Sequence, residues 1–561
     1  MPTPSWASRW LAVCSAVALG IGALACDGEN NPVPDASPSV RELAQDRTYE
    51  TDDPVERACA LPKDEIVRIW RGLYPPRSVD LSMVAQPPNY IGTFDLNSHT
   101  GPWDYLQEVP LVFYGPNHIK ALGEREGLEN ITSVYPTVGA LTGVDLDERD
   151  GRVLSEILKP SDTPPKLVLT IAWDGVGRNV LERWPDHWPN LARMEQEGAS
   201  FVDATVGSSP SQTPTIHATL GTGTFPRSHG ITSINQRVES GAVEEVFLER
   251  DMSALEQSTY GDDIDLALAN EPKVGLLAWV TWHIAMMSHG TQSSGGDADE
   301  VIMVDKGGAA TTAEPGPFTT PSYAYAFSGM EDRAEELDRS DGEVDGKWLG
   351  QEILAKPTNP AWMTHEADLL LEMLEAGEYG ADDVPDLLFT NFKSTDLVGH
   401  HYTMDSRQMA LTLEAQDEAL GRILDYLDRK VRDYVVILTS DHGHTPSYER
   451  TGAYAISNDE LKADLARRYD APADAQLVVT SPSGMHFNRS ALKQYGATGT
   501  DIAEFLNAYT IRENWPGDEL PPGFENRGDE QVFSATFLSS DMPAIMRCAF
   551  GTSQPPPGFK A

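Results

Sequence analysis

Basic residues are scarce in this chain of 561 residues. Lysine and arginine number 42 against 86 aspartates and glutamates, so the formal net charge is −44. A surface of that sign repels nucleic acids and anionic lipid head groups, so we expect neither nucleic-acid binding nor a basic membrane patch. It also repels phosphorylated ligands. A site for phosphate must therefore supply its own positive charge, and bound metal ions are the simplest source.

Long apolar stretches are equally rare, and none beyond the N-terminus is long enough to span a bilayer. At the N-terminus, Arg9 and the apolar residues 10–25 indicate a signal peptide over residues 1–26. Residues 23–26, Ala-Leu-Ala-Cys, can be an ordinary cleavage site. They also resemble a bacterial lipobox, in which Cys26 carries lipid and is the protein's link to a membrane.

Cysteine is the third scarcity, with four residues in the whole chain. If Cys26 is lipidated, Cys59 and Cys548 can pair in an oxidising compartment. An ordinary signal peptide would instead leave the cysteines unpaired. We favour the lipoprotein interpretation and expect an exported protein, periplasmic or on the cell surface.

The middle of the chain alternates apolar runs with an amphipathic segment. The runs at Leu167–Trp173, Asp386–Phe392 and Tyr434–Thr439 predict strands buried on both faces, and the spacing over 406–430 predicts a helix. This order predicts an α/β fold with a doubly wound, mostly parallel sheet and helices on both faces. We expect a linker at 27–60, a first core segment at 61–160, a catalytic core at 161–450 with a surface insertion near 291–320, and a smaller subdomain with a tail at 451–561.

Each of the three predicted strands leads into acidic residues or histidines. The first strand ends at Asp174, the second precedes Asp396 and His400, and the third precedes Asp441 and His442. Ligands of open α/β sheets bind outside the carboxyl ends of the strands, so we expect these side chains at one edge. Taken singly, each could be a polar turn or a cap. Together they predict a metal site, with zinc favoured over manganese or iron.

A nucleophile is predicted within residues 208–217, SSPSQTPTIH. Proline is favoured at the first helical position, so Pro214 makes Thr213 the N-cap of a helix. A hydroxyl there lies beside unpaired backbone N–H groups and the positive end of the helix dipole, which suits an anion. A neighbouring metal could hold that hydroxyl as an alkoxide. The alternatives are a purely structural cap, or Thr215 as the nucleophile.

The order of these motifs resembles the alkaline phosphatase superfamily, especially its nucleotide pyrophosphatase/phosphodiesterase and phosphate-irrepressible branches. Residues 213–231, TPTIHATLGTGTFPRSHGI, carry much of the likeness. The resemblance implies a two-zinc hydrolase of small phosphoric esters, either a phosphatase or a phosphodiesterase, acting through a phosphothreonine intermediate. It implies Thr213 as the nucleophile. One zinc would be surrounded by Asp174, Thr213, Asp441 and His442, and the other would be held by Asp396 and His400.

The second zinc needs one more histidine, which the family normally supplies near its C-terminus. His486 is available there, but its surroundings are similar to a strand and helix of the family's smaller subdomain. Residues 98–116 and 132–143 resemble the family's usual C-terminal end, although here they precede the core. We therefore interpret the chain as circularly permuted, with His99 as the third ligand.

The choice between monoesters and diesters stays open at this point. The family's asparagine that contacts phosphate should fall near Ile234, and Asn235 is the nearest candidate. A phosphonate hydrolase or phosphotransferase of the same fold is an alternative function. A non-catalytic, metal-binding surface lipoprotein is the alternative of a different class.

Overall fold

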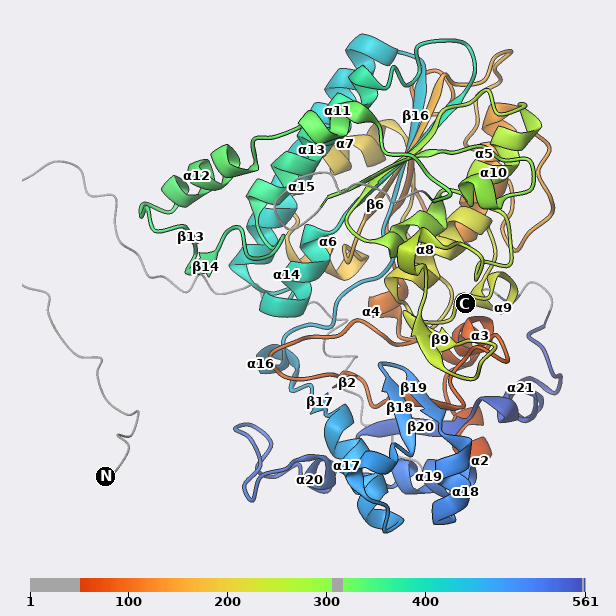
Figure 1. Ribbon diagram of the computed structural model, residues 1–561, viewed down its shortest axis with the longest axis vertical. Helices are drawn as coiled ribbons and strands as arrows, with labels where there is room; N and C mark the ends of the chain where they lie inside the picture. The colour runs from red at the N-terminus through yellow and green to blue at the C-terminus, as the bar shows by residue number, and fades with distance from the viewer. Residues whose placement is uncertain (1–50, 305–315, 557–558, 560) are drawn as a thin grey trace, which may run out of the picture. The chain divides into compact units, whose positions relative to one another are not determined.

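A computed structural model describes residues 51–304, 316–556, 559 and 561 (Figure 1). The predicted signal peptide, most of the predicted linker and the middle of the predicted insertion lie outside the described residues. Among the described helices, none has the length and apolar character needed to cross a membrane.

The larger of the two main sheets has eight strands in the order β12-β11-β15-β6-β16-β3-β7-β4. The first five run parallel, β3 is antiparallel to both of its neighbours, and β7 and β4 are parallel to each other. The strands are β3 (Leu111–Tyr114), β4 (Gly123–Arg125), β6 (Leu167–Trp173), β7 (Ala199–Phe201), β11 (Val274–Ala278), β12 (Glu300–Met303), β15 (Asp386–Phe392) and β16 (Tyr434–Thr439).

Strand β6 explains why the sequence forms a sheet covered on both faces. All of its residues are buried, and successive side chains enter different cores. Val168 and Ala172 belong to one core, whereas Leu169 and Trp173 belong to the other. A continuous apolar run is what such a strand requires, because neither face meets water.

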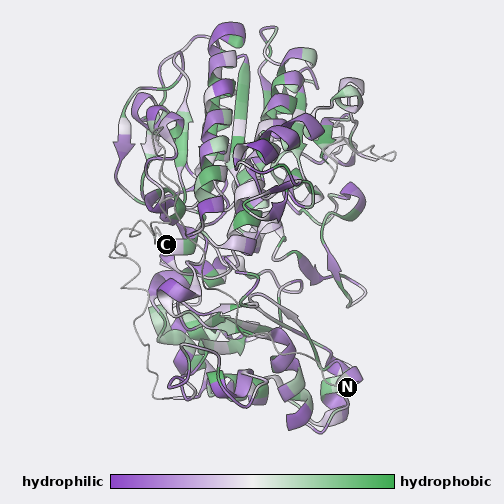
Figure 2. Cartoon of the chain, turned by 90° about the vertical axis from the view of Figure 1, so that its left-hand side faces the viewer, coloured by the Kyte–Doolittle hydropathy of each residue, from purple (hydrophilic) through white to green (hydrophobic). Residues whose placement is uncertain are grey.

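Helices cover both faces of this sheet, which confirms the predicted fold class. Helices α5, α8 and α10 contribute to one core, and α7, α13 and α15 contribute to the other (Figure 1). Figure 2 shows green apolar strands beneath helices that carry purple polar residues. The bounds are α5 (Val134–Thr142), α6 (Arg178–Arg183), α7 (Pro189–Glu197), α8 (Thr213–Thr222), α9 (Pro226–His229), α10 (Tyr260–Ala267), α13 (Pro360–Ala376), α14 (Ser394–Tyr402) and α15 (Arg407–Tyr426).

The smaller main sheet is antiparallel, in the order β18-β19-β1-β20. Its strand β1 comes from the start of the chain and pairs with β19 and β20 from the end, so segments far apart in sequence share a third hydrophobic core. Its elements are α2 (Pro54–Cys59), α3 (Lys63–Gly72), β1 (Leu81–Ala85), α17 (Asn458–Arg468), β18 (Val478–Ser481), β19 (Gly484–Phe487), α18 (Arg489–Tyr495), α19 (Gly499–Asn507), β20 (Phe533–Leu538) and α21 (Met542–Phe550).

Two predicted boundaries differ from the structure. Residues 54–59, the end of the predicted linker, form helix α2, which begins at an Asp53 cap. A disulfide joins Cys59 of this helix to Cys548 of α21, which is the pairing that the sequence allows. Residues 300–303, inside the predicted insertion, form edge strand β12, because a short apolar run is hidden among glycine, serine and threonine.

A buried histidine that contacts helix α8 predicts sensitivity to acid. His229 is fully buried, accepts the Ile231 N–H at Nδ1 and bonds Thr219 through Nε2. Burial lowers the pKa of His229 to about 3 from 6.5. The unfolded chain therefore binds a proton between these values that the folded chain does not bind. We expect the free energy of unfolding to fall as pH drops below 6.5, by about 1.4 kcal/mol per pH unit from this residue.

Denaturant unfolding of the metal-free protein between pH 7 and pH 4 measures this slope. In the variant His229→Gln this slope should be smaller by close to one proton, which is the share of His229. That expectation holds whatever the variant's stability at pH 7. Equal slopes in the two proteins would contradict the assignment.

Candidate metal centre

The three carboxylates predicted as ligands follow three neighbouring parallel strands. Asp174 follows β6 directly, Asp396 lies in the first turn of α14 just after β15, and Asp441 follows β16. All three are nearly or fully buried. Parallel strands end at the same edge of a sheet, and so their local sequences deliver these groups to one place.

One group of possible ligands consists of Asp174, Asp441 and His442. The His442 Nε2 atom lies 3.6 Å from Asp174 Oδ1 and 3.4 Å from Asp441 Oδ2. Burial and the neighbouring Asp174 raise the pKa of Asp441 well above its ordinary value. Carboxylates this close need a cation between them.

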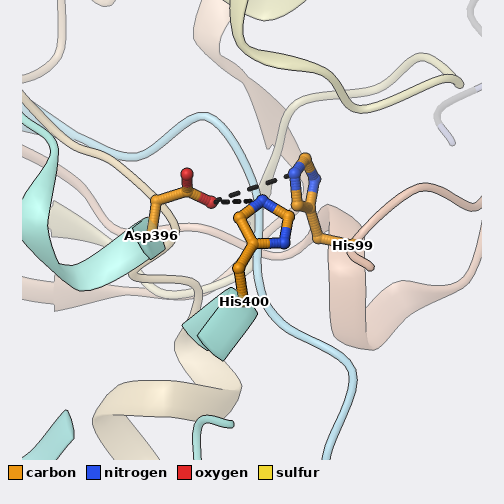
Figure 3. A group of neighbouring side chains, drawn as sticks. All are labelled: His99, Asp396 and His400. Atoms are coloured by element: carbon orange, nitrogen blue, oxygen red, sulfur yellow. Dashed lines mark ion pairs between the residues drawn. The ribbon is translucent and has the colours of Figure 1, made fainter. Parts of the chain in front are cut away.

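A second group consists of His99, Asp396 and His400 (Figure 3). Asp396 Oδ1 lies 3.4 Å from His400 Nε2 and 3.8 Å from His99 Nε2. His99 comes from the loop between β2 (Tyr90–Ile91) and α4 (Asp104–Gln107), far from the other two in the sequence. Its ring also stacks on His442, with ring centroids 3.4 Å apart, so the two groups of ligands are adjacent.

The hydrogen bonds of the imidazoles select the tautomer that a metal needs. His99 Nδ1 lies 2.9 Å from the Ser211 carbonyl oxygen, and His400 Nδ1 contacts the Asn97 carbonyl oxygen. A carbonyl only accepts, so each Nδ1 carries the proton and each Nε2 keeps its lone pair. Burial lowers the pKa of His99 well below its usual value and that of His442 to about 4, which keeps both rings neutral.

Several buried polar atoms facing this centre accept no hydrogen bond from any described residue. Buried polar groups are nearly always paired, and so a cluster of carboxylate and imidazole atoms without hydrogen-bond partners fits a bound cation. Carboxylate and imidazole atoms in this arrangement fit zinc. The atoms concerned are Asp174 Oδ1, Asp396 Oδ1, Asp441 Oδ2, His442 Nε2 and both ring nitrogens of His444.

Thr213 lies at the start of α8, but its position in the helix differs from the prediction. Gln212 is the N-cap, and Thr213 is the first helical residue, followed by Pro214. The proline sits one position later than its preferred place, which moves the helix start by one residue. The Thr213 hydroxyl accepts a hydrogen bond of 3.1 Å from Lys393 Nζ and is almost completely buried.

Lys393 joins the Thr213 hydroxyl to the carboxylates. Its Nζ lies 3.0 Å from Asp174 Oδ2 and 2.7 Å from Asp396 Oδ2, and only 6% of the residue is exposed. Burial alone would lower the pKa of Lys393, but Asp174, Asp396 and Asp441 raise it, so the ammonium stays charged. In turn, this charge helps hold the pKa of Asp174 well below its usual value, against the effect of burial.

His217 and Asn391 brace this arrangement. Asn391 Nδ2 donates to Asp174 Oδ2 at 3.0 Å and to His217 Nε2 at 2.9 Å, and His217 Nδ1 donates to the Thr213 carbonyl at 2.8 Å. Both ring nitrogens of His217 are therefore occupied by the protein. Although Asp174, His217 and His283 lie close enough to hold an ion, His217 has no lone pair left for one.

The two remaining candidates lie on antiparallel strands outside the larger sheet. Asn235 is exposed on strand β9 (Asn235–Arg237), where it pairs with Glu245 of β10 (Val243–Glu245). His486 lies on β19 opposite Val479, in the smaller sheet. His486 belongs to no group of possible metal ligands among the described residues.

Sequence reasoning missed Lys393 and Asn391. It also did not predict His444 as a possible metal ligand. His444 had a signal, because it is the last residue of the motif Asp-His-Gly-His after β16, and its Nε2 lies 3.5 Å from Asp396 Oδ1. The end of β15 carries Asn391 and Lys393. Polar residues are common where a strand ends, so this pair gave no signal of a site. Only the neighbouring chain segments reveal their contacts.

Comparisons with known proteins place the chain among phosphoric ester hydrolases. The family described as type I phosphodiesterase / nucleotide pyrophosphatase matches residues 168–519. The alkaline phosphatase PhoK of Sphingomonas sp. is 22% identical over 395 residues, which cover 62% of this chain and 69% of PhoK. The alkaline phosphatase PafA of Elizabethkingia meningoseptica is 25% identical over 195 residues, 33% of each chain. The crystal structure of PafA aligns with a TM-score of 0.48 and 17% identity, covering 67% of this chain and 85% of that one.

The fold, the site and these matches define a phosphoric ester hydrolase of the alkaline phosphatase superfamily. Within that superfamily, the chain belongs to the family of type I phosphodiesterases and nucleotide pyrophosphatases.

Proposed function

We propose that the protein hydrolyses small phosphoric esters with two zinc ions and a covalent phosphothreonine intermediate at Thr213. The observation that carries this proposal is the hydrogen bond of 3.1 Å from Lys393 to the Thr213 hydroxyl, beside buried ligand atoms that lack donors. The names of PhoK and PafA, both alkaline phosphatases, also support a phosphatase activity.

In this proposal Asp174, Thr213, Asp441 and His442 surround one zinc. The second zinc is held by His99, Asp396 and His400. Zinc lowers the pKa of an oxygen bound to it and neutralises charge on a phosphoryl group. The chain itself supplies the orientation of the ligands, through the Ser211 and Asn97 carbonyls behind His99 and His400. It also excludes water, since nearly all of these side chains are buried.

Thr213 would act as the nucleophile in two steps. Its Oγ1 forms a bond to phosphorus while the ester P–O bond breaks, and the alcohol leaves with a proton. Water then attacks the phosphothreonine, releases phosphate and restores the hydroxyl. The Lys393 ammonium points at Oγ1 and stabilises the alkoxide form. It also offsets part of the negative charge that Asp174, Asp396 and Asp441 would present to the substrate.

A paired assay tests this function. We expect hydrolysis of nitrophenyl phosphate to exceed that of bis-nitrophenyl phosphate, because PhoK and PafA are both named phosphatases. Both activities should disappear with a zinc chelator and return with zinc. Metal analysis should give two zinc ions per chain, as two-metal hydrolases require. Hydrolysis that survives full removal of metal would contradict the proposal, and metal binding without hydrolysis of either ester would favour the non-catalytic alternative.

The Lys393 ammonium predicts a loss of rate without a loss of metal. Lys393→Met keeps most of the volume and removes the charge, so kcat should fall about 100-fold, as when one preorganised donor is removed from an oxyanion site. Zinc content should stay at the wild-type value. The exposed Lys462, which pairs with Asp459 at 2.8 Å, provides the control variant Lys462→Met. A wild-type kcat in Lys393→Met would remove Lys393 from the mechanism.

We also propose that the protein is exported and circularly permuted. The Cys59–Cys548 disulfide supports an oxidising compartment. The family match begins at residue 168, whereas His99 lies before it, which supports the permuted order. Lipidation of Cys26 and a phosphate contact from Asn235 remain predictions, since Cys26 lies outside the described residues and Asn235 is exposed on β9.

A further inference from the structure

A second cluster of acidic residues lies outside the metal centre and shares no residue with it. Asp265 is in the last turn of α10, and Asp297 and Asp299 are on the segment that enters β12. Each carboxylate offers one oxygen, and these three oxygens lie within 4.8 Å of one another. The cluster brings together two segments that are about thirty positions apart in sequence.

Asp265 is the observation that points to a ligand. Only 5% of the residue is exposed, and its buried Oδ1 accepts no hydrogen bond from any described residue. A buried carboxylate oxygen without a partner is costly, and native proteins satisfy nearly all such atoms. Asp299 is 8% exposed, and its Oδ2 accepts a hydrogen bond from the Ser288 hydroxyl.

The charged groups around the cluster leave it without a compensating cation. Asp262, one turn earlier on α10, is paired with His289 at 2.7 Å, so that imidazole is already engaged. No lysine or arginine among the described residues forms an ion pair with Asp265, Asp297 or Asp299. The last turn of α10 has no basic residue, and the negative end of its helix dipole adds to the field.

The acidities of the buried carboxyls are consistent with this imbalance. Burial, with the charges of Asp297 and Asp262, raises the pKa of Asp265 to about 7. Burial, together with the charges of Asp265, Asp262 and Asp297, raises the pKa of Asp299 to about 8, against the opposing hydrogen bond from the Ser288 hydroxyl.

We propose that Asp265, Asp297 and Asp299 bind one calcium ion. The cluster offers only oxygen ligands, and carboxylate oxygens from a loop and a helix end suit calcium's flexible coordination by six to eight oxygens. Zinc is disfavoured because no imidazole or thiolate belongs to the group. Water and main-chain carbonyls would complete the coordination shell, as they do in most calcium sites.

The ion would tie the end of α10 to the segment entering edge strand β12. Helix α10 packs against α5 and α8, and α8 begins with the nucleophile. The calcium ion would raise the free energy of unfolding. Because the cluster shares no residue with the metal centre, the ester chemistry should not depend on the ion. Its test can be read independently of the proposed hydrolase function.

The experiment uses the full, zinc-loaded protein. Equilibrium dialysis against radioactive calcium at about 1 mM, the range in which extracellular calcium modules bind, should give one calcium per chain. The same calcium should raise the melting temperature by about 3 °C, because a ligand that binds only the folded state stabilises it. Magnesium at equal concentration should bind more weakly.

The variant Asp265→Asn distinguishes the effect of the calcium ion from the effect of the buried negative charges. It should bind no calcium and lose the thermal response. In the absence of calcium it should melt above the wild type, because one buried repulsive charge is removed. Asp297→Asn changes an exposed position and should also lose the calcium response. It replaces Asp265→Asn as the test variant if that protein fails to fold. Zinc content and ester hydrolysis should stay at wild-type values in both.

Asp425→Asn provides the matched control, because Asp425 is exposed on α15 and outside every group of possible metal ligands in the described part of the chain. It should bind calcium like the wild type. Failure of the wild type to bind calcium, or unchanged binding in Asp265→Asn, would overturn the proposal. Neither result would bear on the zinc-dependent reaction.

Discussion

Replacing Thr213 by alanine is expected to lower kcat at least about a thousandfold, because the variant has no hydroxyl to form the phosphoenzyme. Only direct attack by water would remain. The fold should persist, since the change removes two atoms from the first turn of α8 and the Thr213 carbonyl still accepts the hydrogen bond from His217. The measurement is kcat on nitrophenyl phosphate, together with zinc content and the melting temperature.

Thr215→Val is the matched control for this variant. Thr215 is also a buried threonine of α8, and valine keeps its shape without the hydroxyl. It should retain most of the activity. If Thr213→Ala stays active and Thr215→Val does not, the nucleophile is Thr215. Acid quenching during turnover should trap a phosphorylated peptide that contains Thr213 in the wild type and none in Thr213→Ala.

Replacing His99 by alanine is expected to remove one of the two zinc ions and nearly all turnover. A catalytic zinc usually has three protein ligands, and without His99 only Asp396 and His400 would remain to hold the second zinc. The His99 Nε2 atom lies 3.8 Å from Asp396 Oδ1, and its Nδ1 is anchored on the Ser211 carbonyl. The measurement is zinc per chain after exhaustive dialysis, combined with kcat.

His486→Ala is the comparison for this prediction. His486 is also buried, but it lies on β19 of the smaller sheet. Its removal should leave zinc content and kcat near the wild-type values, although it can lower the melting temperature. Full zinc and full rate in His99→Ala, with both lost in His486→Ala, would refute the permuted order and restore the conventional one.

The sequence by itself determined the core strands and the candidate metal ligands that directly follow them. Leu167–Trp173, Asp386–Phe392 and Tyr434–Thr439 have the bounds that their apolar runs predict. The reason is local, because a strand buried on both faces must be apolar throughout, and the residues that follow it necessarily reach the sheet edge. Asp174 and Asp441 could thus be placed without any knowledge of distant contacts.

Other features were decided only by the tertiary structure. The loop between β2 and α4 brings His99 close to Asp396, almost three hundred positions away in the sequence, and no local pattern encodes that contact. Lys393 is similar, because a lysine after a strand normally faces water, and only the surrounding carboxylates make a buried ammonium stable. Asn235 lies exposed on the β9–β10 hairpin, and its contact with phosphate stays a prediction. Sequence patterns report the neighbours of a residue along the chain, whereas charge pairing and metal coordination depend on the neighbours that folding brings together.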